Sequence, residues 1–502
     1  MNVTLSPRSG DRAVLALFVV FFIALQFVLR AQPFSDPGAL WHTRVGDQII
    51  AEGFMHTDPF TWSHAGQFWV PQQWLGECVM SIAHRIGGFD TMLTMMNALL
   101  AGFAAWVGKR FIDGGLHPLP AGAIVALGMA VAGFHFYLRP HLATIVLMGV
   151  VTAWLVDFER RRIGIRRMAW LIPICILWTN LHGGVLGGIA TIALAVIGWA
   201  ILRERTAAEV FWLVVIIFGC AIGTLMNPLG FDMHRTWLRI LDNPAMKEFV
   251  PEHYPLNIAR TDGQAVVGFG AFYLFMLAGT LPRRPRVTWL LPLVWLALSF
   301  MGIRHGPLFV AVGLIALADM LPETRWFQLL KKYGDTFAIP ATAVPRRPGL
   351  IVWLPALALI GIAVLLQRSQ IAVPVIGYDW AQFDMKLVPT ELIEPLQEYA
   401  KTKPDRFPIF NDANAGGFIV YFAPSLTTFM DDRFELYGDA GLRDYIDLMH
   451  DHPERIETLR KKVGFDRAIV DTDTVMDDYL KKSGRWKEVR RGNKAVMYEY
   501  VR

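Results

Sequence analysis

Charged residues are scarce in this sequence: they make up 18% of its 502 residues, whereas hydrophobic residues make up 54%. A soluble protein carries roughly a quarter charged residues. The deficit lies in long apolar runs, and a run of about 20 apolar residues is what the core of a bilayer requires. The composition therefore excludes an ordinary soluble protein and predicts an α-helical polytopic membrane protein.

A cysteine framework is also lacking. The cysteines are Cys78, Cys175 and Cys220, and the last two lie in apolar runs. Cysteines so few and so placed indicate neither a disulfide framework nor a metal cluster. The histidines near residues 42, 56 and 64 do not have metal-ligand spacing either. We therefore assign no metal ligands, and leave open whether a divalent metal ion is required.

The apolar runs predict about eleven transmembrane helices, although several runs are shorter than a full span of the bilayer. The first run follows Arg8 and Arg12, and no small-residue cleavage site follows it, so we predict a retained span and no cleaved signal peptide. The runs lie near residues 13–31, 88–108, 120–136, 142–157, 168–181, 185–202, 209–226, 264–281, 288–302, 307–321 and 349–367.

The loops between the runs are of two alternating kinds. One kind is rich in Lys and Arg, as at residues 159–167 and in the segment from Arg325 to Arg347. The other kind holds few cations but many His and Trp residues. Because Lys and Arg are retained on the cytoplasmic side, we predict the N-terminus inside and the second kind of loop outside. The net charge of +5 is then a matter of orientation and indicates no nucleic-acid partner.

We expect a transmembrane domain over residues 1–368 with a long first outer loop at 32–87. Amphipathic segments in that loop, near residues 40–50 and 74–83, predict helices at the membrane interface. Residues 369–502 predict a small α/β domain outside the membrane. Its expected strands lie near 408–410, 418–421, 427–430 and 467–470, its helices near 442–449 and 453–462, and its closing hairpin at 486–500.

Polar side chains recur where the chain turns on the predicted outer face. Ionisable groups at membrane depth are costly and usually face a cavity, so this clustering predicts a polar site there. Polar helix ends and headgroup anchors are the alternative explanation. The candidate residues are Asp36, Trp41, His42, Asp58, Arg139, His141, Asn180, His182, Asn227, Glu248, Arg304 and His305.

Such a set suits glycosyl transfer. A sugar hydroxyl needs a carboxylate that accepts its proton, and Asp36 or Asp58 can serve. A phosphate leaving group needs positive charge, which the arginines and histidines at 139, 141, 304 and 305 can supply. Tryptophans such as Trp41 can stack on a sugar ring. Asp36 and Asp58 each adjoin a proline and can equally be turn residues, and Asp432-Arg433 can be a surface ion pair.

The first outer loop resembles that of a large group of bacterial membrane glycosyltransferases of the GT-C fold, the superfamily of protein O-mannosyltransferases and lipid A aminoarabinose transferases. The resemblance continues through most of the chain. It rests on Asp36-Pro37, Leu40-Trp41-His42, Gly46, Ile49-Ile50, Gly53, Asp58-Pro59-Phe60-Thr61, Trp69 and Gln73-Trp74-Leu75, then on Asn180 to Gly184, Asn227 to Gly230, Glu248-Phe249, Arg304-His305, Asn411, Gly416-Gly417-Phe418, Asp432-Arg433 and Tyr437.

The resemblance implies a polyprenyl-phosphate sugar as donor, an outward-facing active site in the bacterial cytoplasmic membrane, and a catalytic acid at the position of Asp36. The acceptor would be an envelope glycan, lipid or protein, and the enzyme a hexosyl or pentosyl transferase. Many relatives carry a second acid two positions later, where this sequence has Gly38. The alternative is therefore a non-catalytic GT-C-like protein of cell-envelope assembly. A transporter fits less well, because transporters place polar groups near the bilayer midplane.

Overall fold

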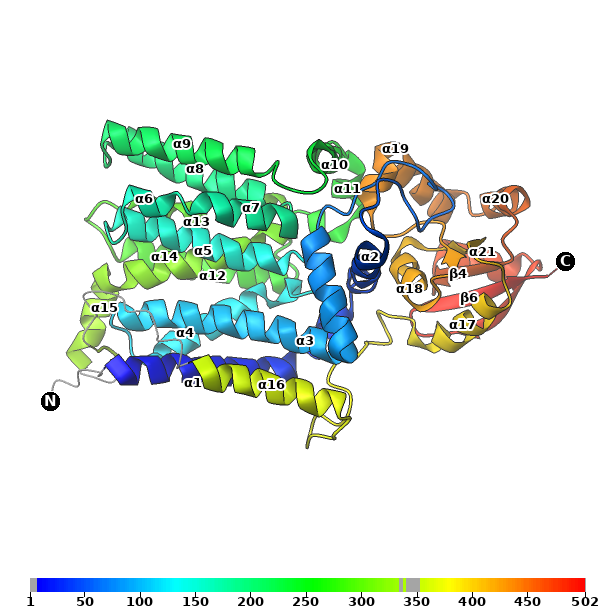
Figure 1. The fold of residues 1–502 in the computed structure, drawn as a ribbon, viewed down its shortest axis with the longest axis horizontal. Coiled ribbons are helices and arrows are strands. Elements are labelled where there is room, and N and C mark those ends of the chain that lie inside the picture. Colours follow the sequence, from blue (N-terminus) through cyan, green and yellow to red (C-terminus); the bar gives the residue numbers. More distant parts are fainter. Residues whose placement is uncertain (1–6, 334–336, 340–352, 502) are drawn as a thin grey trace.

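The computed structural model describes residues 7–333, 337–339 and 353–501. It consists of a bundle of roughly parallel helices at one end and a small α/β domain at the other (Figure 1). The N-terminal end of the described chain lies at the end of the bundle far from the α/β domain, and the C-terminal end lies at the far end of the α/β domain. Part of the basic segment from Arg325 to Arg347, and the start of the run at 349–367, fall outside the described residues.

Each predicted apolar run contains a helix. The helices are α1 (Pro7–Val28), α3 (Trp74–Asp113), α4 (Pro118–Ala132), α5 (Leu142–Glu159), α7 (Leu171–Leu181), α8 (Val185–Ile201), α9 (Ala207–Gly223), α12 (Thr261–Ala278), α13 (Val287–Met301), α14 (Gly306–Met320) and α16 (Leu354–Arg368). Among the described residues, 5 helical segments are long and apolar enough by themselves to cross a membrane: those in α1, α3, α4, α5 and α14. This agrees with a membrane protein, and the count of about eleven spans stays a prediction.

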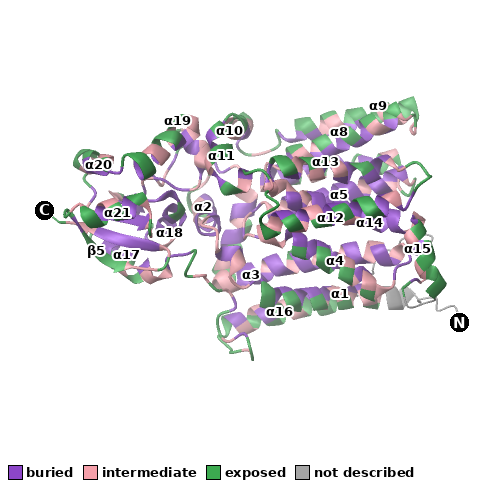
Figure 2. Cartoon of the chain, turned by 180° about the vertical axis from the view of Figure 1, so that it is seen from behind, coloured by how far each residue is buried: buried purple, intermediate pink, exposed green. Residues whose placement is uncertain are grey.

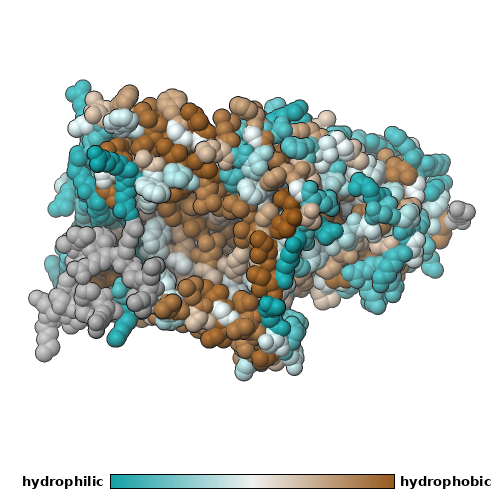
Figure 3. Space-filling model, in the orientation of Figure 1, coloured by the Kyte–Doolittle hydropathy of each residue, from teal (hydrophilic) through white to brown (hydrophobic). Residues whose placement is uncertain are grey.

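The hydropathy of the surface divides the molecule in the same way. In Figure 3 apolar side chains cover the helix bundle, whereas hydrophilic side chains cover the α/β domain and the end of the bundle near the N-terminus. Helix α14 lies inside the bundle and is buried along nearly its whole length, whereas α9 and α16 lie on the outside (Figure 2). The apolar outer face needs a lipid environment, because water would not cover so large an apolar surface.

Buried polar pairs hold the helices in register. Gln367 on α16 donates to the Thr94 hydroxyl on α3 at 2.7 Å, and Asn97 donates to Gln26 on α1 at 3.1 Å. At the other end of the bundle, the Glu159 carboxylate accepts the backbone N–H of Val287 at 3.0 Å and so caps α13. Hydrogen bonds of this kind add to close packing where no hydrophobic effect drives helices together.

The first outer loop is largely helical. It contains η1 (Gln32–Phe34) and α2 (Gly38–Glu52), and it ends in the first part of α3. Helix α3 bends sharply at Gly87 and Gly88, where Gly88 has φ +64°, a conformation that favours glycine. The helices predicted near 40–50 and 74–83 are present as α2 and the first part of α3, and their place at the membrane interface stays a prediction. The bend at Gly87–Gly88 lets α3 change direction between the outer segment and the bundle (Figure 1).

The loop between α9 and α12 is also folded, into α10 (Phe231–Leu241), α11 (Pro244–Phe249) and η3 (Pro251–His253). Four short elements lie at the predicted basic turns: α6 (Ile165–Met168), η5 (Leu321–Glu323), α15 (Arg325–Leu330) and η6 (Lys331–Tyr333). The short η2 (Gly133–His135) lies instead between α4 and α5, beside a predicted outer turn. The turn before α14 is η4 (Ile303–His305). The segment 227–262 therefore packs against the α/β domain, through α10 and α11, as folded structure and not as a free loop.

The α/β domain has a four-stranded sheet in the order β2-β4-β6-β5 and a separate parallel pair of β1 and β3. Strands β2 and β4 are parallel, and the other pairings in the larger sheet are antiparallel. The elements are η8 (Thr390–Leu392), α17 (Ile393–Lys401), β1 (Phe407–Pro408), β2 (Phe410–Asn411), α18 (Ala413–Phe422), β3 (Leu426–Thr427), α19 (Phe434–Ile446), the π-helical turn η9 (Asp447–Asp451), α20 (Arg455–Val463), β4 (Arg467–Asp471), α21 (Val475–Lys482), β5 (Trp486–Arg491) and β6 (Ala495–Tyr500).

The predicted β4 strand and the closing hairpin are confirmed, but the strand predicted at 418–421 is wrong. Those residues lie in α18, whose start is capped by the Asp412 side chain. A short apolar run does not distinguish a strand from a buried helix. Gly417 serves the packing of this helix: a Cβ there would lie 2.6 Å from the Pro37 carbonyl oxygen, so the glycine lets α18 pack directly on the start of α2.

Candidate active site

Asp36 lies at the junction between the helix bundle and the α/β domain, immediately before α2. Its Oδ1 accepts the backbone N–H of Gly38 at 2.7 Å, so it does form the turn that begins the helix. The same Oδ1 also accepts a hydrogen bond from Nε of Arg139 at 2.6 Å. The turn and a guanidinium from the segment before α5 therefore hold the same carboxylate oxygen.

Arg139 gathers carboxylates from three separate parts of the chain. Besides Asp36, its Nη1 lies 3.5 Å from Oε2 of Glu252 in η3, and its Nη2 lies 3.3 Å from Oδ2 of Asp432 in the α/β domain. The side chains of Arg139 and Asp432 are 20% and 10% exposed, so the cluster is sheltered but keeps some contact with solvent. We call Asp36, Arg139, Glu252 and Asp432 the Arg139 cluster.

The carboxylates of the cluster differ in acidity. Burial raises the pKa of Asp36, and Arg139 opposes that shift only in part. Burial also raises the pKa of Asp432, to about 7, against the attraction of Arg139 and with the repulsion of Asp36. For Glu252, burial is outweighed by Arg139 and further cations, and its pKa falls to about 2. The site thus holds one strong acid and two carboxyls that bind protons more tightly than usual.

The position of Gly38 explains why a second acid is missing there. A Cβ on Gly38 would lie 2.3 Å from Nε of Arg139 and 2.6 Å from Oδ1 of Asp36. Any side chain at this position would therefore displace the guanidinium from Asp36. In this protein the further carboxylates of the site come from Glu252 and Asp432, far away in the sequence.

Histidines line the site on the side of the helix bundle. The rings of His135 and His141 lie 4.6 Å apart, and those of His141 and His182 lie 6.4 Å apart. Burial lowers the pKa of His141 to about 4 and that of His182 to about 3, so both imidazoles are neutral at pH 7. They act through hydrogen bonds and not through charge.

The tautomers of the two histidines follow from their partners. His141 donates from Nε2 to the His135 carbonyl oxygen at 2.9 Å, so its proton is on Nε2. The other ring nitrogen, Nδ1, has no partner and can only accept a hydrogen bond. His182 accepts the Gly184 N–H at Nδ1 at 2.9 Å, so its proton is on Nε2. In the neutral state His182 can therefore donate a hydrogen bond to an anion and His141 cannot, which revises the expected role of His141.

Arg304 adds a second cation beside the cluster. Its Nη1 donates to Nε2 of His253 at 3.0 Å, and no carboxylate in the described part of the chain forms an ion pair with it. Its neighbour His305 packs its ring near Trp295, 5.9 Å between centroids. The Arg304 guanidinium keeps donors available for an anionic group, whereas Arg139 is already surrounded by carboxylates.

Asp58 lies in a different, enclosed cluster. Its Oδ1 accepts from Arg433 at 2.7 Å and its Oδ2 from the Thr61 hydroxyl at 2.5 Å, and the side chains of Asp58 and Arg433 are fully buried. Asp431 accepts the same guanidinium. Asp432-Arg433 is therefore no surface ion pair: Arg433 points into the core and Asp432 points to Arg139.

Other predicted site residues have structural partners. The His42 ring bonds to Glu77 at 2.9 Å and packs against Trp41, with both residues buried. Asn180 accepts the Trp74 indole N–H at 2.7 Å. Two further candidates lie apart from the Arg139 cluster, since Asn227 accepts the Leu229 N–H at 2.8 Å within its own turn and Glu248 is 54% exposed and forms an ion pair with Arg443.

Sequence reasoning did not single out His135, Glu252 or His253. Glu252 lies only four residues after Glu248 in the same predicted loop, but nothing in the local sequence distinguishes the two acids. Within residues 7–333, 337–339 and 353–501, no group of three or more His, Cys, Asp or Glu side chains is arranged to hold a metal ion.

Neither a family model nor a curated protein matches the sequence. Solved structures do match. The oligosaccharyltransferase of Archaeoglobus fulgidus in its apo form matches 92% of this chain and 69% of its own, with 12% identity and a TM-score of 0.54. Its complex with an inhibitory peptide and a dolichol-phosphate gives 14% identity, 91% and 69% coverage, and a TM-score of 0.51.

The apo structure of ArnT from Cupriavidus metallidurans matches 97% of both chains at 16% identity with a TM-score of 0.48. At these identities the likeness concerns the fold alone. The match to the archaeal oligosaccharyltransferase extends over nearly the whole chain and includes the helix bundle and the domain after it. The chain therefore has the GT-C fold that its first outer loop predicted.

Proposed function

We propose that this protein transfers a sugar from a polyprenyl-phosphate-linked donor to an envelope acceptor at the outer face of the bacterial cytoplasmic membrane. The observation that carries the proposal is the Asp36 carboxylate, held by Arg139 where the helix bundle meets the α/β domain. A transferase of this kind needs a base in a sheltered place that a lipid-linked donor and a water-soluble acceptor can both reach. The junction offers such a place.

Asp36 is the proposed general base. It takes the proton of an acceptor hydroxyl, whose oxygen then attacks the anomeric carbon while the bond to the phosphate oxygen breaks and the polyprenyl phosphate leaves. Its raised pKa favours this role, since a base works best when its pKa lies near the working pH. Arg139 orients the carboxylate through the bond at 2.6 Å.

Arg304 and His182 are the proposed partners of the donor phosphate. A guanidinium without a carboxylate partner can form two parallel hydrogen bonds to phosphate oxygens. The Nε2 proton of His182 adds a neutral donor. Together they stabilise the negative charge that develops on the leaving phosphate. Arg139 contributes less here, because three carboxylates already surround it.

An apolar groove of about 640 Å³ is the proposed place for part of the polyprenyl chain. It begins close to the site, because Gly76, two residues after Trp74, lies directly against Pro140, which follows Arg139. The similar archaeal structure with a bound dolichol-phosphate agrees with a lipid-phosphate carrier. The groove is lined mainly by Trp74, Leu75, Ile176, Leu177, Met226 and Pro228.

The test is transfer of labelled sugar from polyprenyl-phosphate donors by the purified protein in liposomes. We expect label to move to an envelope-derived acceptor with release of polyprenyl phosphate. Asp36→Asn should reduce the rate by about 10²- to 10⁴-fold, the usual contribution of a general base. Glu248→Gln is a matched control, since Glu248 is an exposed acid outside the Arg139 cluster.

Two results would contradict the proposal in different ways. If Asp36→Asn turned over at a near-normal rate, Asp36 would be a turn residue only and Asp432 would be the next candidate for the base. If the folded wild-type protein neither transferred sugar nor released the lipid phosphate with any donor in a panel of hexose and pentose carriers, the non-catalytic alternative would be favoured.

A further inference from the structure

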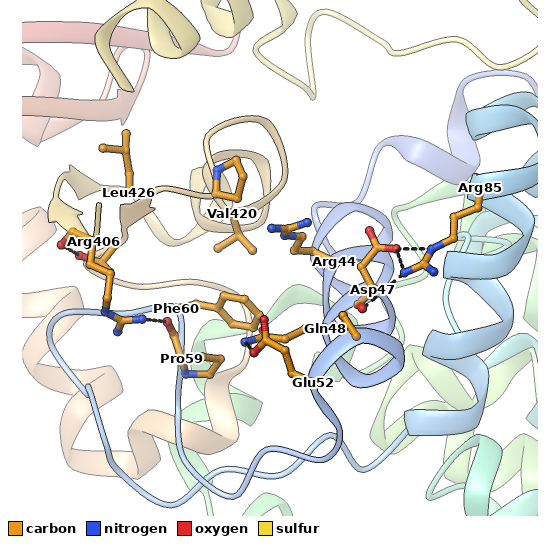
Figure 4. A pocket seen from close by; sticks show the side chains of 13 residues that line it. Arg44, Asp47, Gln48, Glu52, Pro59, Phe60, Arg85, Arg406, Val420 and Leu426 are labelled. Atoms are coloured by element: carbon orange, nitrogen blue, oxygen red, sulfur yellow. Dashed lines mark hydrogen bonds and ion pairs between the residues drawn. The ribbon is translucent and has the colours of Figure 1, made fainter. Parts of the chain in front are cut away.

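A second pocket lies on the opposite side of α2 from the helix bundle, and no step of the proposed transfer uses it. It has a volume of about 350 Å³ and lies between α2, the Pro59–Phe60 segment and the α/β domain. Figure 4 shows Arg44 reaching from α2 into this space, with Phe60 and Val420 facing it and Arg406 at the far wall. We call it the α2 pocket.

The three arginines that line the α2 pocket differ in whether they have a hydrogen-bond or ion-pair partner. Arg85 is paired with Asp47 at 3.0 Å. Arg406 uses one nitrogen for the Pro59 carbonyl oxygen at 3.2 Å. Arg44 forms no hydrogen bond or ion pair with any residue that the structure describes, although it is half-buried. A half-buried guanidinium without a partner loses hydration and gains nothing in return, so an anionic ligand would stabilise it.

The remaining lining alternates between apolar and polar surface. Val420 and Leu426 are buried apolar residues, and the Phe60 ring is partly exposed beside them. On α2, the Gln48 amide donates a hydrogen bond of 3.3 Å to the Glu52 carboxylate, and both side chains line the pocket. An aromatic or apolar surface suits the C–H face of a sugar ring, while carboxylates, amides and guanidinium groups suit its hydroxyls.

We infer that the α2 pocket binds an acidic saccharide, one that carries a carboxylate or a phosphate, as part of the acceptor. Arg44 and Arg406 would hold the acidic group, and Phe60, Gln48 and Glu52 the sugar ring and its hydroxyls. This inference rests on the proposed function only in treating the saccharide as the acceptor of the transferred sugar. Binding itself requires no catalysis.

The position of the pocket fits an acceptor subsite. Asp36 lies just before the first residue of α2, Gly38, and Arg44 lies six residues further along the same helix. At 1.5 Å per residue this is roughly 9 Å along the helix axis. Several linked sugar units can span that distance, so one acceptor chain can place a hydroxyl at Asp36 and an acidic unit at Arg44.

Equilibrium binding to the full-length protein in detergent micelles tests the inference. The probes are a short oligogalacturonate and a phosphorylated oligosaccharide, each compared with a neutral oligosaccharide of equal length and with inorganic sulfate. We expect at least one acidic oligosaccharide to bind at least about tenfold more tightly than the neutral one. Arg44→Gln should weaken that binding at least about tenfold, and Arg44→Lys should restore it only in part, because Lys cannot form paired bonds.

Matched variants separate the possible explanations. Arg490→Gln removes an exposed arginine from β5, outside the pocket, and should change nothing. Asp36→Asn should leave saccharide binding unchanged while it slows transfer, so a failure of the proposed function does not mimic a failure of this inference. The inference is overturned if neither acidic oligosaccharide binds, if the neutral one binds equally well, if sulfate binds as tightly as the saccharides, or if Arg44→Gln has no effect.

Discussion

At the scale of single residues, Arg139 explains most of the site. It binds an acid from the first outer loop, an acid from the segment after α11 and an acid from the α/β domain. Three carboxylates around one guanidinium leave an excess of negative charge, which is relieved when one carboxyl keeps its proton. Burial raises the pKa of Asp432 to about 7, and the repulsion from Asp36 and Asp431 adds to the shift, so Asp432 is the carboxyl that gains a proton first near neutral pH.

Variants of Arg304 test whether its guanidinium binds the donor phosphate. Arg304→Ala should weaken donor binding by roughly tenfold or more, since a charge-assisted hydrogen bond contributes about 1.5–3 kcal/mol. Arg304→Lys should not restore it, because Lys is a point charge and the phosphate needs paired donors. The measurement is donor affinity for both variants. A mere headgroup anchor would tolerate Lys, so full affinity in Arg304→Lys with little loss in Arg304→Ala would contradict the phosphate role.

Asp432 should make stability depend on pH. Its pKa is 3.8 in the unfolded chain and about 7 in the folded one, so between these values the folded state binds more protons. The contribution of Asp432 to stability then falls as the pH rises from about 4 to 7. Asp432→Asn removes this slope, and its melting temperature relative to wild type should increase from pH 5 to pH 8. Thermal unfolding at both pH values measures the effect, and a constant difference would contradict it.

At the scale of elements, the segment between α2 and α3 fastens the outer loop to the α/β domain. Trp62 donates its backbone N–H to the Thr428 carbonyl at 2.9 Å, and its ring stacks on Phe429 and Phe465. Asp58 joins the same interface through Arg433. Asp58 is thereby a docking residue, and the Trp62 ring belongs to the aromatic core of the α/β domain.

Arg433→Met should loosen this interface. It leaves Asp58 and Asp431 buried without their cation, and breaking a buried pair typically costs about 3–5 kcal/mol. Unfolding in denaturant and limited proteolysis between α2 and α3 would report the loss. Arg443→Met is the control, because Arg443 lies in α19, which begins directly after Arg433, is 45% exposed and forms ion pairs that face solvent. Equal stability of the two variants would contradict the docking role, and Asp58→Asn with Asp431→Asn should partly rescue Arg433→Met.

At the scale of the whole molecule, the two ends of the bundle differ. One end holds the Arg139 cluster and the α/β domain. The other holds Arg160, which binds Asp319 at 2.9 Å, and the hydrophilic surface near the N-terminus in Figure 3. A protein with basic residues at one end and its site at the other fits a single orientation in the membrane.

We expect that orientation to be N-terminus inside and α/β domain outside. Fusions of a reporter that is active only in the cytoplasm should give signal after Arg162, between α5 and α6, and none after Arg368, at the end of α16. A periplasmic reporter should give the reverse. A cytoplasmic signal after Arg368 would mean that the number of spans is even where we predict an odd one, and would place the proposed site on the inner face.

The sequence by itself determined the helix bundle, the amphipathic helices of the outer loop and the closing hairpin, because these follow from hydrophobic periodicity, which is local. The GT-C fold was implied by a resemblance to known membrane glycosyltransferases, which rests on motifs such as Asp36-Pro37. Only the tertiary structure decided which acids meet. Glu252 rather than Glu248 reaches Arg139, Asp432 comes to it from the far domain, and Asp58 is enclosed by Arg433. Such contacts depend on how distant elements pack, and the sequence of one segment carries no record of its neighbour in space.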